Sequence, residues 1–69
     1  MKPKYIIAQF DAIEWYTQFR TDQEEPSKQW SPSPDSAQHY EELDDAILVL
    51  GAITKRRDCA YYIFKQEEA

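Results

Sequence analysis

The sequence predicts an α+β domain in which a three-stranded sheet carries one long amphipathic helix on one face. Three observations lead to this fold. Two short segments of strand-like composition lie near the N-terminus, a helical pattern with start and stop signals follows, and a short aromatic segment comes near the end. The element order is therefore strand, strand, helix, strand (ββαβ). Because the chain has only 69 residues, we expect residues 1–69 to form a single small domain.

The composition is typical of a folded chain without a membrane span. The chain is 42% hydrophobic and 14% aromatic, whereas disordered segments are poor in aromatic residues. Its longest apolar run covers residues 46–53, and a membrane-spanning helix needs about 20 apolar residues. The first residues lack the long apolar stretch of a secretory signal. Since Cys59 is the only cysteine, no internal disulfide can form, and we expect a reducing, cytoplasmic location.

The first two strands are expected to form a hairpin. Residues 5–10 (Tyr-Ile-Ile-Ala-Gln-Phe) are rich in strand-forming types, and Asp11-Ala12 follows as a weak turn. Residues 13–20 alternate as in a half-buried antiparallel strand. One face would carry Ile13, Trp15, Thr17 and Phe19, and the other would carry Glu14, Tyr16, Gln18 and Arg20. A helix over residues 5–20 is the alternative, because apolar residues there also recur at helical spacing.

Residues 21–34 are expected to form a proline-rich loop. Three of the four prolines lie here, and hydrophobic periodicity is absent. A connection of about 14 residues is long for so small a domain, so the loop is either mobile or functional. Trp30 lies within it, and its ring either folds back over the sheet or contacts a partner. We favour folding back, with partner contact as the alternative.

The helix is predicted over residues 33–57. Ser33 would be the N-cap and Pro34 the first helical residue, where the missing N–H costs nothing. Basic residues 55–57 would close the helix at the negative end of its dipole. The apolar arc would consist of Tyr40, Leu43, Ala46, Ile47, Val49, Leu50 and Ile53. Gly51 interrupts this arc and indicates either close packing or an earlier helix end.

A last strand is expected at residues 59–65, followed by a polar tail at residues 66–69. The alternation would place Tyr61 and Ile63 on one face, and Tyr62 and Phe64 on the other. A helix between the second and the last strand would make these two strands parallel if they are neighbours. The sheet face opposite the helix would then carry Tyr16 together with one side of the last strand.

No residue pattern predicts an enzyme, a metal site or a cofactor. His39 and Cys59 each occur once. The predicted helix would hold them about 30 Å apart at 1.5 Å per residue, too far for a nucleophile and its base. No Cys/His spacing supplies the ligands of a zinc site. The acidic pairs at 41–42 and 44–45 would each point about 100° apart on a helix, so they are interpreted as a solvated acidic face.

The candidate protein-binding residues are Glu41, Asp44, Asp45, Leu48, Trp30, Tyr16 and Tyr62. Leu48 falls on the same exposed strip of the predicted helix as the first three, which are acidic. An apolar residue ringed by acids is typical of an interface anchor within a polar rim. The two tyrosines would lie on the outer sheet face. The alternatives are an exposed leucine without a role and a cross-strand pair that stabilises the sheet.

The formal charge of −5 indicates which partners to expect. It disfavours direct binding to nucleic-acid backbone and favours a protein with a basic surface. Alternatively, the acidic residues imitate the phosphates of DNA and block a DNA-binding protein. A further alternative is structural, because a chain of this size buries only about 60% of its unfolded surface. A homodimer that pairs outer sheet faces or edge strands would complete the core.

The layout resembles that of small phage and prophage accessory proteins. The resemblance rests on the aromatic second strand (residues 14–19, Glu-Trp-Tyr-Thr-Gln-Phe), the capped acidic helix and the closing aromatic strand (residues 60–64, Ala-Tyr-Tyr-Ile-Phe). It covers the whole chain but concerns layout and size, so no residue roles carry over. Members of this class often bind and block one host protein. The resemblance therefore implies a small acidic, non-enzymatic inhibitor that docks on a basic surface of a host protein.

Overall fold

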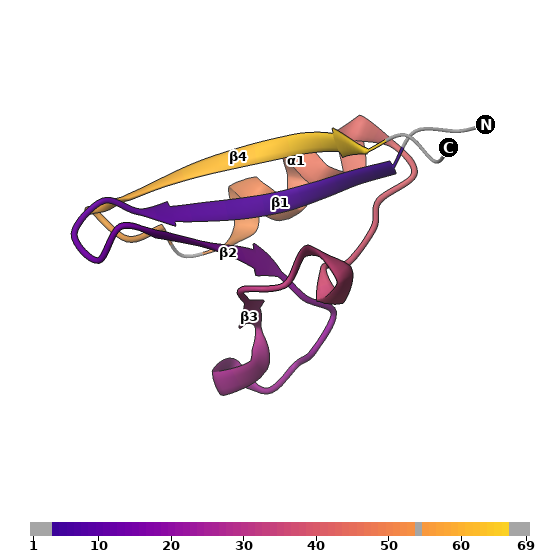
Figure 1. Ribbon diagram of the computed structural model, residues 1–69. Helices are drawn as coiled ribbons and strands as arrows, with labels where there is room; N and C mark the ends of the chain where they lie inside the picture. The colour runs from indigo at the N-terminus through magenta and orange to yellow at the C-terminus, as the bar shows by residue number, and fades with distance from the viewer. Residues whose placement is uncertain (1–3, 54, 67–69) are drawn as a thin grey trace.

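The computed structural model describes residues 4–53 and 55–66. In these residues the chain forms a four-stranded antiparallel sheet with one α-helix on one face (Figure 1). The elements are β1 (Lys4–Asp11), β2 (Tyr16–Arg20), β3 (Trp30–Ser31), α1 (Leu43–Ala52) and β4 (Cys59–Gln66). The strand order is β3-β2-β1-β4. The predicted α+β class is confirmed, but the predicted three strands are wrong, because the segment after β2 supplies a fourth.

β1 is a central strand, paired along both edges. Ile6, Ile7 and Ala8 are buried although they point alternately to the two faces of the sheet. Burial on both faces explains why this strand is an almost continuous apolar run. β2 pairs antiparallel with it, with Ala8 opposite Phe19. The predicted hairpin is therefore confirmed, and the alternative of an N-terminal helix is wrong.

The turn between β1 and β2 is organised by the carboxylate of Asp11. Its Oδ1 accepts hydrogen bonds from the backbone N–H groups of Ile13 (2.9 Å) and Glu14 (3.0 Å), and its Oδ2 lies 3.6 Å from Nη1 of Arg56. The main-chain oxygen of Asp11 accepts a further bond of 2.8 Å from the N–H of Trp15, which has a left-handed φ of 63°. β2 consequently begins later than predicted.

The face of β2 that looks toward α1 is the reverse of the predicted one. Directly opposed residues of paired strands share a sheet face, and Phe10 is opposite Thr17 as Ala8 is opposite Phe19. Ile7 packs against α1, so the even-numbered residues of β1 point away from the helix. Thr17 and Phe19 therefore lie on the open face. A two-residue period fixes which residues share a face but not which face is covered.

The proline-rich segment is held by its own hydrogen bonds. Thr21 is buried, and its N–H donates to the carbonyl of Gln29 at 2.8 Å while its hydroxyl donates to that of Lys28 at 2.6 Å. A 3-10 turn at Pro26–Lys28 lies inside the loop thus closed. β3 follows and pairs with β2. Residues 21–31 of the predicted loop therefore form a small lobe with a turn and a strand, which lies below the sheet in Figure 1.

The predicted cap at Ser33 forms, but it caps a different element. Ser33 Oγ accepts a hydrogen bond of 3.3 Å from the N–H of Asp35. The turn that it caps is a single 3-10 turn, Pro34–Ser36. The helix itself begins only at Leu43, with Glu42 as N-cap. The local capping chemistry was therefore correctly predicted, whereas the helix start was wrong.

The late start of α1 follows from the backbone of Tyr40. Tyr40 exchanges two hydrogen bonds of 2.8 Å with the backbone of Tyr5, and the N–H of Gln38 donates to the carbonyl of Arg20 at 2.9 Å. A backbone group that is bonded to a strand is not available to a helix. These residues therefore run alongside the sheet, and the helix can form only after them.

The C-terminal end of α1 is closed by a basic residue, as predicted. Nζ of Lys55 donates to the carbonyl of Leu50 at 2.7 Å, which satisfies an otherwise free carbonyl at the negative end of the dipole. The helix ends at Ala52, earlier than predicted. Gly51 lies next to this end, and a Cβ added to it would meet nothing within 4 Å. Gly51 therefore marks the helix end and not a close approach.

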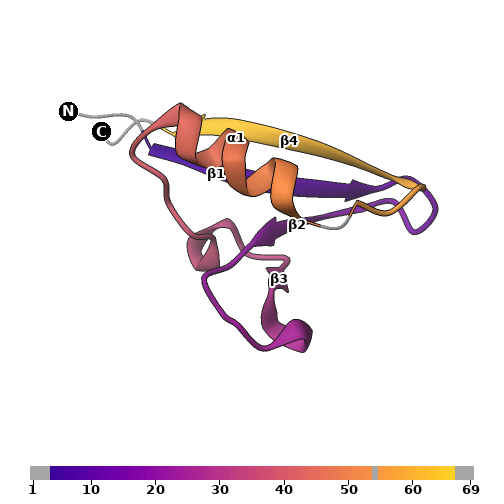
Figure 2. The same ribbon diagram turned by 180° about the vertical axis from the view of Figure 1, so that it is seen from behind.

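β4 runs antiparallel to β1 along its whole length, from Cys59 opposite Asp11 to Gln66 opposite Lys4. β2 and β4 both run antiparallel to β1, so they share one direction, as expected for strands joined by a helix. They are not neighbours, because β1 lies between them, so the condition for a parallel pair is not met. The chain crosses one face of the sheet through α1, which lies in front of β1 and β4 in Figure 2, and returns as β4 on the far side of β1. Residues 67–69 of the predicted polar tail lie outside the described residues.

The core lies between α1 and the strands β1 and β4. Ala46 is fully buried, and it forms one cluster with Ile7 and Tyr40. Because alanine is small, the helix can approach the sheet closely at this point. The partly buried residues that pack around this cluster are Tyr5, Trp30, Val49, Leu50, Ile53 and Ile63.

Asp11→Asn is expected to destabilise the protein at neutral pH and to have little effect in acid. The N–H of Glu14, opposed by burial and assisted by Ile13 and Arg56, holds the pKa of Asp11 below its usual 3.8. A lowered pKa in the folded state contributes stability above the unfolded value, which is lost as the pH falls through the folded value. Thermal melts from acid to neutral pH should show a difference in melting temperature between the unchanged protein and Asp11→Asn, and this difference should disappear below pH 3.8. A difference in melting temperature that is the same at every pH would contradict this account.

Candidate functional site

The candidate site is the helix strip, which we define as Asp44, Asp45 and Leu48. Residues three and four apart share a helix face, so Leu48 lies one turn beyond both carboxylates. Leu48 is 72% exposed, and both aspartates are exposed. Ala46, two positions before Leu48, is buried against the sheet, so Leu48 points almost directly away from it. The structure therefore brings together these three predicted site residues.

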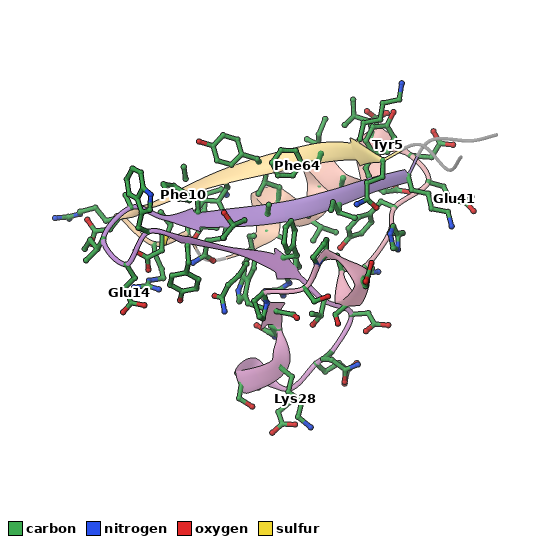
Figure 3. All side chains as sticks on the ribbon, in the orientation of Figure 1. Tyr5, Phe10, Glu14, Lys28, Glu41 and Phe64 are labelled. Carbon is green, nitrogen blue, oxygen red and sulfur yellow. The ribbon has the colours of Figure 1, made fainter. Side chains whose placement is uncertain are left out.

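Glu41, the fourth predicted member, does not belong to the helix strip. It precedes the N-cap Glu42 and is exposed in the chain that leads into α1. Figure 3 shows Glu41 near one end of the molecule and Glu14 at the other. Asp44 and Asp45 lie in the first helical turn, where the positive end of the helix dipole stabilises negative charge.

Leu43 and Ile47 lie beside the strip and are half exposed, although both were predicted to enter the core. The helix presses Ala46 against the sheet. Val49 is turned toward β2 and β3, where it lines a pocket together with Trp30. The opposite flank of α1, which carries Leu43 and Ile47, therefore overhangs β4 and remains open to solvent.

Trp30 folds back onto the sheet, as favoured from the sequence. Its ring centroid lies 6.2 Å from that of Tyr61, and the guanidinium carbon of Arg20 lies 5.5 Å from its ring centroid. The ring is half-buried and packs against the core cluster. These contacts attach the lobe of residues 21–31 to the sheet, so Trp30 has a structural role in the monomer.

Tyr16 and Tyr62 lie on opposite faces of the sheet. Tyr16 is opposite Asp11, on the α1 side, whereas Tyr62 is opposite Ala8, on the open side. The predicted shared outer face is therefore wrong, and so is the alternative of a cross-strand pair, because β1 separates the two strands. Tyr62 instead stacks on Phe64 of its own strand, with ring centroids 6.1 Å apart.

An open pocket of about 560 Å³ lies between the end of α1 and β3. Arg20, Trp30 and Arg56 are among its lining residues. Both guanidinium groups are already engaged: Nη1 of Arg20 donates to Oε1 of Gln29 at 3.3 Å, and Arg56 pairs with Asp11. The pocket is therefore interpreted as the space between the lobe and the C-terminal end of α1, and not as a ligand site.

His39 and Cys59 lie at opposite ends of β4. Nε2 of His39 is 3.2 Å from Oε1 of Gln66, while Sγ of Cys59 accepts a hydrogen bond of 3.2 Å from Nε2 of Gln9. They do not form a nucleophile and base pair. Within residues 4–53 and 55–66, no group of three or more His, Cys, Asp or Glu side chains is placed to hold a metal ion.

Sequence reasoning missed the apolar tip of the β1–β2 hairpin. Ile13 is 72% exposed and Trp15 is 76% exposed, although the alternation placed both on a buried face. The Trp15 ring rests edge-on against Phe10, with centroids 5.2 Å apart. The signal that was available is Asp11, because an aspartate after a strand often bonds to the backbone two or three residues later and opens a turn.

Comparison with models of known protein families, with curated proteins and with solved structures found no match. The resemblance to phage accessory proteins therefore stays a prediction. Of the helices in the part of the chain that the structure describes, none has the length and apolar character needed to cross a membrane.

The two tryptophans are expected to differ strongly in fluorescence. In Trp15→Phe the remaining Trp30 is half-buried against Tyr61, so its emission should be blue-shifted and weakly quenched by acrylamide. In Trp30→Phe the remaining Trp15 is 76% exposed, so its emission should be red-shifted and strongly quenched. Trp30→Phe should also lower the melting temperature more than Trp15→Phe does. Equal quenching of both variants would contradict the packing of Trp30.

Proposed function

We propose that this protein is a non-enzymatic protein-binding module that docks on a basic surface of another protein through the helix strip. The observation that carries the proposal is the exposure of Leu48, which is 72% exposed one turn beyond two carboxylates. Burying a side chain of this size contributes about 1.5–3 kcal/mol. A partner that covers Leu48 gains this energy, and the folded monomer does not use it.

The charge of the strip supports a basic partner. Asp44 and Asp45 lie at the positive end of α1, and the chain as a whole carries a formal charge of −5. Such a field speeds the encounter with a positively charged surface and makes it dependent on salt. Acidic residues around an apolar centre also set the orientation of docking, since a rim of one charge sign matches only a rim of the other.

In this function the protein would bind one host protein and block it. A small domain with an exposed anchor can cover a basic groove without chemistry of its own, as the layout-level resemblance to phage and prophage accessory proteins implies. The action would take place in the cytoplasm. If the partner is a DNA-binding protein that competing DNA releases, the acidic surface instead imitates DNA.

The partner can be identified by capture from a lysate of source cells. The tagged protein is incubated with lysate, washed at low and at high salt, and the bound proteins are identified by mass spectrometry. One dominant partner that is lost at high salt supports docking by the acidic strip. A partner that resists high salt contradicts the electrostatic part of the proposal.

Leu48→Asp is expected to weaken binding to the captured partner by about 30-fold or more, the loss typical of an interface anchor. Ile13→Asp is the matched control, because Ile13 is equally exposed at 72% but lies on the hairpin tip, away from α1. It should leave the affinity unchanged. Isothermal titration calorimetry measures both variants. Equal losses in the two variants, or no loss in either, would show that this surface is the wrong one.

A further inference from the structure

β4 is an outer strand of the sheet with a long open edge. One side of β4 lies against β1, and in residues 4–53 and 55–66 no strand lies along its other side. The strand covers Cys59–Gln66 and pairs with β1 without a bulge. An open strand edge of this length is a template for pairing with another strand.

The hydrogen bonds of β1 show which backbone groups of β4 point outward. Tyr5 bonds through both its N–H and its carbonyl to Tyr40, on the side away from β4. Successive residues of a strand direct these groups to opposite sides, so the even-numbered residues of β1 bond to β4. The even-numbered Ala12 agrees with this alternation, because its N–H donates at 3.0 Å to the carbonyl of Asp58, the residue before β4.

Tyr61 and Ile63 therefore direct their N–H and carbonyl groups to the open edge. They are opposite Gln9 and Ile7, which are odd-numbered residues of β1 that do not bond to β4. Four backbone groups in the middle of β4 are thus aligned for a neighbouring antiparallel strand.

Half-exposed apolar side chains flank this edge on both faces. On the open face, Tyr62 is 48% and Phe64 is 46% exposed, and their rings are stacked; Figure 3 shows Phe64 on β4. On the helix face, Leu43 is 43% and Ile47 is 51% exposed on the flank of α1 that overhangs β4. We name these four residues the edge shoulders.

β4 carries few of the features that prevent edge pairing. Natural edge strands are protected by prolines, bulges or charged side chains. From Cys59 to Gln66 the sequence contains no proline and a single charged residue, Lys65. The regular register with β1 excludes a bulge.

We propose that two copies of this chain pair their β4 edges antiparallel, about a two-fold axis perpendicular to the sheet, and form one continuous eight-stranded sheet. A two-fold axis between antiparallel strands must have this direction, so both helices lie on the same face. With Ile63 on the axis, the outward N–H and carbonyl groups of Ile63 and Tyr61 form hydrogen bonds with β4 of the second copy. Tyr62 then lies opposite the partner's Phe64, and Phe64 opposite the partner's Tyr62.

A second copy fits this edge better than an unrelated strand, because it covers both faces at once. A single added strand would satisfy the backbone but would leave most of the edge shoulders exposed. In the two-fold pairing, the aromatic shoulders of the two copies meet on one face, and the flanks with Leu43 and Ile47 approach each other on the other. β4 carries a single charge, on Lys65, and antiparallel pairing keeps it away from the Lys65 of the second copy. Two chains of formal charge −5 therefore meet along two strands that carry little charge.

The first test combines sedimentation with amide hydrogen exchange of the whole chain. Sedimentation equilibrium should show a mass that rises toward twice 8.2 kDa with concentration. In the same range, the amides of Tyr61 and Ile63 should become protected, whereas those of Tyr62 and Phe64 are bonded to β1 at every concentration. A monomer up to near-millimolar concentration would overturn the proposal. A dimer in which the amides of Tyr61 and Ile63 stay unprotected would overturn it too, because the contact would then lie away from the edge of β4.

The second test exchanges charge across the proposed seam. One double variant carries Tyr62→Lys and Phe64→Lys, and the other carries Tyr62→Glu and Phe64→Glu. Each should lose the dimer alone, because like charges then lie opposite each other, and a mixture of the two should regain it. Failure to regain the dimer, with both variants folded by circular dichroism, would contradict the direct contact. Because these side chains are half exposed, the substitutions should preserve the fold.

The proposed dimer is independent of the proposed function. Leu48 points away from the sheet and not toward β4, so Leu48→Asp should leave the mass in sedimentation unchanged while it weakens binding of the partner protein. Loss of the dimer in Leu48→Asp would place the self-association on the helix strip and overturn edge pairing.

Discussion

The two hydrogen bonds of 2.8 Å between the backbones of Tyr5 and Tyr40 constrain most of this architecture. They continue the ladder beside β1 beyond the end of β2, so the chain before α1 is extended along the sheet. The ring of Tyr40 is buried, and its hydroxyl donates to Oε1 of Gln38 at 3.0 Å. Burial raises the pKa of Tyr40 above its usual 10.0, although Arg20 opposes the shift, so this phenol is neutral at physiological pH.

The short helix that results cannot cover the sheet. α1 has ten residues and is about 15 Å long at 1.5 Å per residue, whereas the eight residues of β1 extend over about 26 Å. The hairpin end of the sheet is therefore uncovered, which explains why Tyr16 is partly exposed on the helix side. Ala46 fixes where the helix touches the sheet, and from this contact Leu48 is turned to solvent. The exposure of Tyr16, Leu43, Ile47 and Leu48 thus follows from the position and length of one helix.

Most features that depend on residues close together in the sequence were predictable, among them the β1–β2 hairpin. Features that depend on pairing between distant segments were not. The Ser33 cap, the basic close of the helix at Lys55 and the adjacency of Leu48 to its two acids all rest on local spacing, and all occur. The start of the helix was wrong because no local pattern shows that the Tyr40 backbone is bonded to a strand. The face of Tyr16 was wrong because alternation leaves the choice of covered face open.

The two proposed surfaces have different physical origins and lie in different directions, so they can act together. The helix strip arises from helical spacing and points away from the sheet, whereas the β4 edge arises from the strand order and lies in the plane of the sheet. A perpendicular two-fold axis would place both strips on the same side of an eight-stranded sheet. Two linked anchors bind a partner with two basic patches at an effective concentration that reaches about millimolar. A weak single contact at Leu48 would then be sufficient for stable binding, provided that the partner is itself repeated or symmetric.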